Sequence, residues 1–164
     1  MTTTLIERDC MIWDDYFLGF AFHAALRSKD QSTKHGCVLV KDNKIIGTGY
    51  NSFPAGMPDS ELPQTRPEKY AWMVHSEQNA LYNAAGNTKN ATAYVTGRCC
   101  TTCLMALHQA GISRVVMADR VGWKLDSQQA EVFDRFKELS DMVIVFRKFD
   151  IDAWLTKIAR TFNA

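Results

Sequence analysis

Two short stretches of the chain carry side chains whose types and spacing could bind and use a metal ion. In HSE, His75 and Glu77 stand two positions apart. In CCTTC, Cys100 and Cys103 stand three apart at the start of a predicted helix, so their sulfurs share one face of it. A helix N-terminus favours thiolates, and two thiolates with one imidazole make three zinc ligands. Three protein ligands and an open fourth position are the arrangement of a catalytic zinc.

Glu77 cannot lie on the same helix face as His75, because residues two apart on a helix point about 200° away from each other. We therefore expect His75 at the helix entry, outside regular helical dihedrals, so that both side chains converge on the metal region. Glu77 would then be a proton shuttle beside water whose pKa zinc lowers to about 7. Taken alone, His75 could be a cap or core residue and CxxC a redox motif, but together the motifs favour zinc hydrolysis.

The elements that position these motifs follow from the hydrophobic periodicity. It predicts helices over 12–28, 76–85, 101–110, 127–139 and 152–162, and strands over 36–40, 44–50, 92–96, 113–118 and 142–146. Asp42 and Asn43 suit the tight turn of a β-hairpin, and residues 51–68, which hold all 4 prolines, predict an irregular loop. The alternation predicts an α/β fold with three α-β-α layers and a mixed five-stranded sheet, and residues 1–164 are expected to form a single domain.

Composition excludes several partners. Lys and Arg number 19 against 18 Asp and Glu, with no visible basic stripe, so we expect no long nucleic acid as partner. No apolar run approaches about 18 residues, and residues 1–10 do not have the pattern of a signal peptide, so we expect no membrane span and no leader. The 5 cysteines, three of them between positions 99 and 103, are unlike a secreted disulfide framework and indicate a reducing, cytoplasmic location.

From about Trp13 to Phe149 the chain resembles the deoxycytidylate (dCMP) deaminases of the cytidine deaminase-like superfamily. The resemblance is carried by WDDYFLGFAFHAALRSKD, NKIIGTGYNSFPAG, ELP, HSEQNALYN, AYVT, CCTTCLMALHQAGI and FRKF. HxE with CxxC is the signature of zinc nucleobase deaminases and indicates only the chemistry. The RSKD and GYNxxPxG runs indicate the branch that acts on nucleotides. The resemblance implies a cytidine deaminase-like fold and zinc-dependent hydrolysis of dCMP to dUMP and ammonia.

The resemblance also implies a role for each matching residue. His75, Cys100 and Cys103 would hold one catalytic Zn²⁺, and Glu77 would move protons. Substrate contacts would come from the residues Ser28, Lys29, Asn51 and Ser76.

Ser28 and Lys29 would bind the 5′-phosphate, for which a hydroxyl and a lysine are natural partners; the alternative is a solvated helix terminus. Asn51 would contact the sugar or the pyrimidine, or serve only as a turn residue before Pro54. The backbone N–H of Ser76 would bind the pyrimidine carbonyl. Members of the family are commonly homo-oligomers, often hexamers, activated by dCTP and inhibited by dTTP, and Mg²⁺ would accompany such a triphosphate. The loop that begins at Asn51 takes part in effector binding in such enzymes.

Three positions depart from the family pattern. Ser76 stands where alanine is usual, Cys99 where proline usually precedes the first metal cysteine, and Met117 where an aromatic residue is common. Cys99 is a competing thiol, but only Cys100 forms CxxC with Cys103. Two alternatives stay open: a deaminase of another nucleobase, nucleoside or tRNA base, and a non-catalytic zinc module. A tRNA deaminase would require a basic surface, and a non-catalytic zinc module would not require a carboxylate that does not bind the metal.

Overall fold

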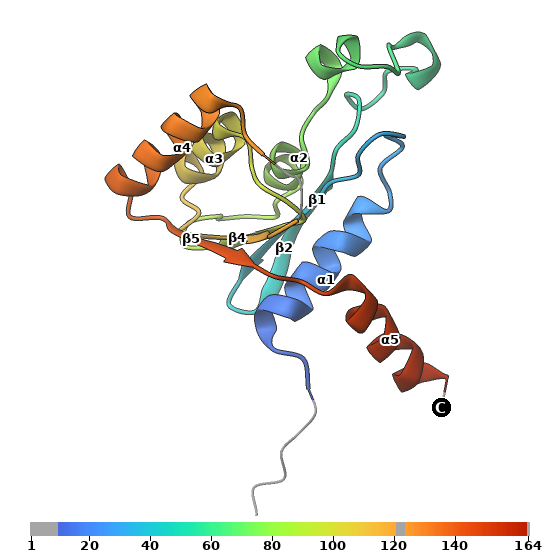
Figure 1. Ribbon diagram of the computed structural model, residues 1–164, viewed down its shortest axis with the longest axis vertical. Helices are drawn as coiled ribbons and strands as arrows, with labels where there is room; N and C mark the ends of the chain where they lie inside the picture. Colours follow the sequence, from blue (N-terminus) through green and yellow to red (C-terminus); the bar gives the residue numbers. More distant parts are fainter. Residues whose placement is uncertain (1–9, 121–123, 164) are drawn as a thin grey trace, which may run out of the picture.

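The structure is a computed structural model that describes residues 10–120 and 124–163 (Figure 1). Its elements are α1 (Trp13–Ala25), β1 (Gly36–Lys41), β2 (Lys44–Tyr50), η1 (Asp59–Glu61), η2 (Glu68–Trp72), α2 (Ser76–Tyr82), β3 (Thr92–Val95), α3 (Thr101–Gln109), β4 (Arg114–Ala118), α4 (Ser127–Leu139), β5 (Val143–Arg147) and α5 (Ile151–Phe162). The predicted order of helices and strands is confirmed. The expectation of no leader concerns mainly residues 1–9, which lie outside the described residues. Among the described helices, none is long and apolar enough to cross a membrane.

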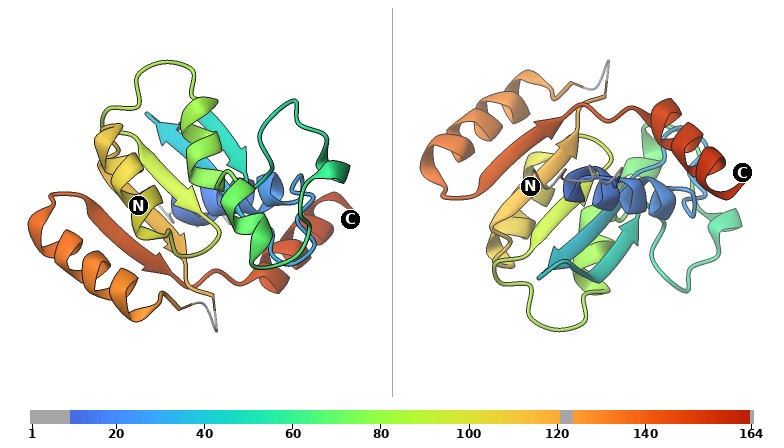
Figure 2. Two further views of the ribbon diagram at one scale, coloured as in Figure 1. Left: turned by 90° about the horizontal axis from the view of Figure 1, so that it is seen from above. Right: turned by 90° about the horizontal axis from the view of Figure 1, so that it is seen from below.

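The strands form one mixed sheet in the order β2-β1-β3-β4-β5. β1 pairs antiparallel with β2 and β3, whereas β3, β4 and β5 run parallel. Helices α2, α3 and α4 cover one face, and α1 with α5 lies on the other (Figure 2). This confirms the predicted three-layer fold.

Alternation along the strands divides the core between the two faces. Leu39, Val95 and Met117 point toward α2 and α3, while their neighbours Val38 and Val116 point toward α1. All five side chains are at most 1% exposed. The β1–β2 hairpin closes as predicted, because the turn residues between the strands both take positive φ, 50° at Asp42 and 57° at Asn43.

The predicted helices 12–28 and 76–85 both end earlier than their periodicity suggests. After α1, the backbone N–H groups of Leu26, Arg27 and Ser28 donate three residues back, which tightens the last turn and ends the helix. After α2, the N–H of Ala85 donates to the Ile46 carbonyl at 2.8 Å, so the chain leaves the helix to follow β2. Tertiary hydrogen bonds of this kind leave no mark in the apolar pattern.

The loop between β2 and α2 is more ordered than the predicted irregular segment 51–68. It contains η1 and η2, and Ser52 and Val74 close it with two backbone hydrogen bonds of 2.8 and 3.1 Å. Asn79, in α2, donates to the Tyr50 carbonyl at 2.8 Å and to Ser52 Oγ at 3.1 Å. Both ends of the loop are therefore tied to the start of α2.

Gly49 allows α2 to lie directly on β2. A Cβ at this position would stand 2.2 Å from the Ser76 carbonyl oxygen and 2.3 Å from the Ala80 nitrogen. Real Cβ atoms do not approach backbone so closely, so any side chain here must displace the first turn of α2. The glycine thus sets the distance between the sheet and the helix that carries His75 and Glu77.

We expect Gly49→Ala to lower the free energy of unfolding by about 3 kcal/mol, because the helix backbone cannot move aside without repacking. Urea denaturation of both proteins measures this difference. Gly97→Ala is the matched control, since a Cβ there would meet only side-chain atoms, the His35 ring at 3.4 Å and Arg120 at 3.9 Å. Equal stability of the two variants would contradict the close packing of α2 on β2.

Candidate metal centre and active site

Two helix entries place the predicted metal ligands. His75 is the N-cap of α2 with ψ 156°, and Cys100 is the N-cap of α3 with ψ 160°, so both have extended rather than helical backbone. The expectation that His75 stands at the helix entry is confirmed. Gln78 holds this entry, because its side-chain oxygen accepts from the His75 backbone N–H at 3.1 Å. Cys103 lies one turn into α3, and its N–H donates to Cys100 Sγ at 3.5 Å.

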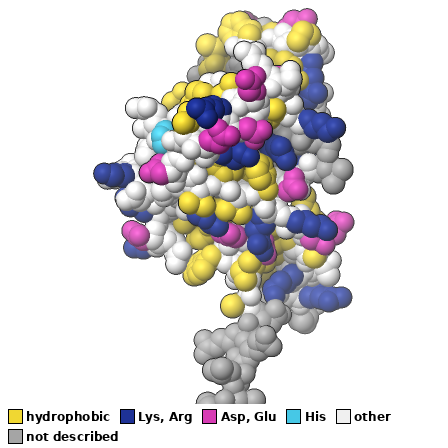
Figure 3. Space-filling view, turned by 60° about the vertical axis from the view of Figure 1, so that its left-hand side comes forward, with side chains coloured by type: hydrophobic (Ala, Val, Ile, Leu, Met, Phe, Trp, Pro, Cys, Tyr) yellow, Lys and Arg dark blue, Asp and Glu magenta, His cyan; other side chains and the backbone are white. Residues whose placement is uncertain are grey.

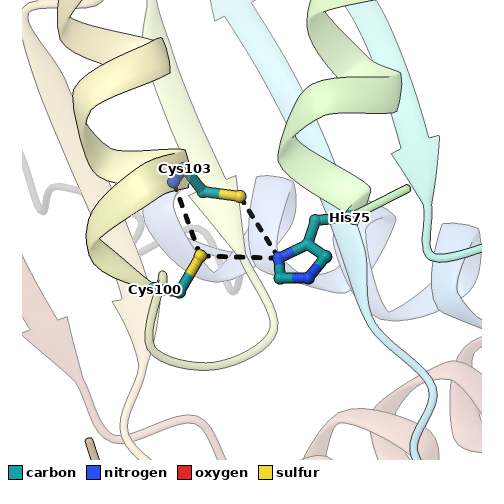
Figure 4. A group of neighbouring side chains, drawn as sticks. All are labelled: His75, Cys100 and Cys103. Carbon is teal, nitrogen blue, oxygen red and sulfur yellow. Dashed lines mark hydrogen bonds between the residues drawn. The ribbon is translucent and has the colours of Figure 1, made fainter. Parts of the chain in front are cut away.

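The three predicted ligand side chains converge between the two helices (Figure 4). His75 Nδ1 lies 3.5 Å from Cys100 Sγ and 3.3 Å from Cys103 Sγ, and all three ligand atoms lie within 4.8 Å of one another. Around a tetrahedral zinc with ordinary bond lengths, a nitrogen and a sulfur ligand stand about 3.5 Å apart. The donor set and its spacing therefore fit a zinc ion. Among the described residues, this is the one group of three or more potential ligands that close together.

The pKa values of the three side chains indicate which protons a bound metal ion would displace. Hydrogen bonding with Cys103, and then with the His75 ring, holds the pKa of Cys100 well below its usual value. The hydrogen bond to Cys100, together with burial, raises the pKa of Cys103. Hydrogen bonding to Cys100 likewise raises the pKa of His75. A cluster of this kind takes up a divalent cation by releasing protons, so its metal affinity falls at low pH.

Glu77 lies beside the metal ligands without belonging to their group. It occupies the first turn of α2 and is 5% exposed. Burial, and then the Glu77 charge, raises the pKa of both Cys37 and Cys99, so the carboxylate acts on two buried thiols beside it. A buried carboxylate next to an open metal position can take a proton from water and return it to a substrate.

Cys99 and Met117 both have roles that the sequence did not indicate. Cys99 is fully buried, its N–H donates to Met117 Sδ at 3.3 Å, and burial, followed by the Glu77 charge, raises the pKa of its thiol. Met117 is also fully buried, so this position supports the loop before Cys100 and offers no face on which a base could stack. Cys99 contributes no atom to the ligand group, which consists of His75, Cys100 and Cys103.

Ser28 and Asn51, two of the predicted substrate contacts, lie together in a buried network. The Ser28 hydroxyl donates to the Asn51 carbonyl at 2.8 Å, and the two residues are 2% and 7% exposed. Asn51 Oδ1 accepts from the His35 N–H at 2.8 Å, and its Nδ2 donates to the Thr33 carbonyl at 2.9 Å. The network fixes the segment that leads into β1 at the edge of the site.

The loop after β2 is anchored to this network by a buried ion pair. Lys69 Nζ lies 2.7 and 2.9 Å from the two carboxylate oxygens of Asp30, and the side chains are only 4% and 6% exposed. Burial would raise the pKa of Asp30, but hydrogen bonds from Lys69, Thr33 and Ser32 outweigh it and hold that pKa below its ordinary value. Hydrophobic periodicity cannot predict such a pair, because in the sequence each of the two charged residues is expected to lie in solvent.

Lys29, the other predicted phosphate contact, lies outside this buried network. It pairs with Asp59 and lines a cavity of about 670 Å³ between the end of α1 and the loop after β2. Arg27, Asn79 and Asn83 also line this cavity, whereas the residues of the metal group do not. The structure therefore brings Ser76 and Glu77 to the metal group, and it places Lys29 on the neighbouring cavity.

Known proteins share this arrangement. Residues 11–119 match the cytidine and deoxycytidylate deaminase zinc-binding region. The chain belongs to this family. It is 36% identical over 151 residues to a deoxycytidylate deaminase of Pongo abelii, with 86% of this chain and 82% of the relative covered. The corresponding enzyme of Homo sapiens is 35% identical over 150 residues, with 86% and 82% covered.

The fold of this deaminase agrees with that of solved structures. The apo crystal structure of the dCMP deaminase from cyanophage S-TIM5 superposes with a TM-score of 0.63 and 20% identity, covering 82% of this chain and 96% of that one. The resemblance and the fold predicted from the sequence are thus confirmed, and the family description includes zinc binding. The roles of individual residues remain predictions that rest on the geometry.

His35 is a residue of this deaminase that the sequence did not single out. Burial, the Arg120 cation and His75 lower the pKa of the His35 ring to about 4. The ring is therefore neutral at physiological pH and adds no charge next to His75. A histidine immediately before a buried strand has no spacing signal, so only the folded position reveals this neighbour.

Metal analysis of two cysteine variants distinguishes the ligand from its neighbour. Cys100→Ala should lose most of the roughly one zinc per chain, because it removes a donor of the group. Cys99→Ala should keep its zinc, since the Cys99 thiol faces Glu77 and the core. Loss of zinc from Cys99→Ala with retention in Cys100→Ala would exchange the two assignments.

Proposed function

We propose that this chain catalyses the zinc-dependent hydrolytic deamination of dCMP to dUMP and ammonia. The observation that carries the proposal is a buried carboxylate, Glu77, next to a His/Cys/Cys group that has the spacing of zinc ligands. Relatives named deoxycytidylate deaminase, which align over 82% of their own length, support the choice of substrate. A nucleoside or tRNA substrate has no comparable support among these relatives.

In the proposed site, His75, Cys100 and Cys103 hold the zinc ion. Bound zinc supplies a Lewis acid that makes water nucleophilic at neutral pH. Glu77 takes a proton from the attacking water and gives it to N3 of the pyrimidine as the water oxygen bonds to C4. It then moves the second proton of the water to the amine, and the C4–N bond breaks to release ammonia. Ser76 would donate its backbone N–H to the pyrimidine carbonyl.

The nucleotide contacts would come from two neighbouring places. Asn51 and Ser28 shape the segment before β1, and their polar groups are largely engaged within the protein. We propose that Asn51 approaches the sugar or pyrimidine from this fixed position, and that Ser28 acts on the phosphate mainly by orienting the loop that carries Lys29. Lys29 is exposed and able to exchange Asp59 for a phosphate.

Regulation and assembly form a finer part of the proposal. The loop that begins after Asn51 lines the 670 Å³ cavity, and the part of this cavity away from Lys29 would take the effectors dCTP and dTTP, with Mg²⁺ on the triphosphate. A homo-oligomer, such as a hexamer, would cover exposed apolar side chains such as Leu155 and Phe162. All five cysteines are free thiols, as is usual for proteins of a reducing compartment, which supports a cytoplasmic location. The face in Figure 3 mixes acidic and basic side chains.

Glu77→Gln should keep about one zinc per chain and lose at least about 100-fold in turnover of dCMP, because the amide cannot carry the proton. Ammonia release and metal analysis of the same preparation measure both quantities. Glu131→Gln, which makes the same change at an exposed position of α4, is the control. Appreciable turnover of dCMP by Glu77→Gln would remove this residue from the proton transfer.

Lys29→Ala should reduce the preference for dCMP over deoxycytidine by about tenfold in kcat/KM, because a charged hydrogen bond to the phosphate is lost. Steady-state kinetics with both substrates gives the ratio for the parent and the variant. Lys44→Ala removes an exposed lysine at the start of β2 and should leave the ratio unchanged. An unaltered ratio in Lys29→Ala would exclude Lys29 from the phosphate site.

A further inference from the structure

Ser76 places a buried hydroxyl directly on the proposed proton shuttle. Its side chain is 0% exposed, and Ser76 Oγ donates to Glu77 Oε2 at 2.9 Å. The helix backbone around it is packed on β2, where Gly49 leaves no space for Ser76 to move back. A buried hydroxyl needs a partner, and the hydrogen bond that the structure gives this one is to the carboxylate of Glu77.

The hydrogen bond restrains the orientation of the carboxylate. Glu77 has three side-chain torsions, and a carboxylate at the end of such a chain can rotate away from the reacting atoms unless something holds it. A donor on Oε2 fixes the plane of the carboxyl group. The buried Cys99 thiol carries no charge to compete for the carboxylate, since burial and the Glu77 charge both raise its pKa. Ser76 and Cys99 are both positions at which the chain departs from the family pattern, in which alanine and proline are usual.

We propose that Ser76 is a positioning residue, whose hydroxyl holds Glu77 in the orientation that proton transfer to the pyrimidine requires. This role goes beyond the backbone N–H of Ser76, which would contact the substrate, and it rests on the proposed function. Since the hydroxyl acts on Glu77, its removal should affect the reaction step and spare the binding of substrate and metal.

Ser76→Ala tests the proposal with the zinc-loaded protein. We expect kcat for dCMP to fall about tenfold while KM stays within about twofold, as for loss of an interaction with a charged group that matters mainly in the transition state. Zinc per chain and the melting temperature should match those of the parent. Ser113→Ala, which removes an exposed hydroxyl just before β4 that donates to the Ala91 carbonyl at 3.5 Å, should match the parent in every measurement.

Binding experiments give a readout that does not depend on turnover. The 2′-deoxyriboside 5′-monophosphate of pyrimidin-2-one has no amine to lose, and it can take up water across its N3–C4 double bond, with oxygen on C4 and a proton on N3. Its tight binding requires a correctly placed Glu77. Ser76→Ala should bind this compound about tenfold more weakly than the parent and should bind dUMP equally well.

The outcomes separate the two proposals. A parent protein that releases no ammonia from dCMP overturns the proposed function. An active parent with Ser76→Ala within twofold of its kcat, and equal in affinity for the pyrimidin-2-one nucleotide, overturns only the positioning role. Loss of zinc, of thermal stability or of dUMP affinity in Ser76→Ala would also overturn it, because the hydroxyl would then support the fold of the site rather than the orientation of Glu77.

Discussion

The candidate active site depends on the contact between two helix entries that are distant in sequence. His75 and Cys100 each have extended backbone and begin a helix on the same face of the sheet. Gly49 lets α2 lie against β2, and the parallel pairing of β3 with β4 directs α3 back over the sheet beside it. Only when both helices keep these positions do an imidazole nitrogen and two sulfurs stand within zinc-ligand distance. Packing of backbone on backbone therefore determines the metal geometry.

The second level of organisation is the environment of Glu77. Its carboxylate is held by Ser76, adjoins Cys99, and lies on a core that includes Cys37 and Met117. Glu77 is only 5% exposed, so these surroundings keep bulk water away from its carboxylate. A shuttle that exchanges protons with one water and one substrate is more selective than one that exchanges with solvent. In the proposed site, the entry and first turn of α2 would thus supply a ligand, a base and a restraint on the base.

Much of this arrangement could be predicted from the sequence, because periodicity and motif spacing report local structure. The hairpin turn at Asp42 and Asn43, the extended backbone at His75 and the element order all followed from such signals. The early end of α2 could not, since it depends on a hydrogen bond to Ile46 across the fold. The contact between Ser76 and Glu77 was also out of reach, because side-chain orientation is determined by packing, which only the three-dimensional structure contains.

The Asp30–Lys69 pair has a consequence for how the loop after β2 responds to its surroundings. Dissolved ions weaken charge pairs that water reaches and hardly affect pairs that are almost fully enclosed. The attachment at Lys69 is therefore insensitive to ionic strength, whereas the exposed contact between Lys29 and Asp59 is readily screened. Salt in the cell would weaken the Lys29–Asp59 contact at the cavity and leave the Lys69–Asp30 pair unchanged. The loop is thus held at both ends and at Lys69 whatever the electrolyte, while its contact with the end of α1 through Lys29 weakens as ionic strength rises.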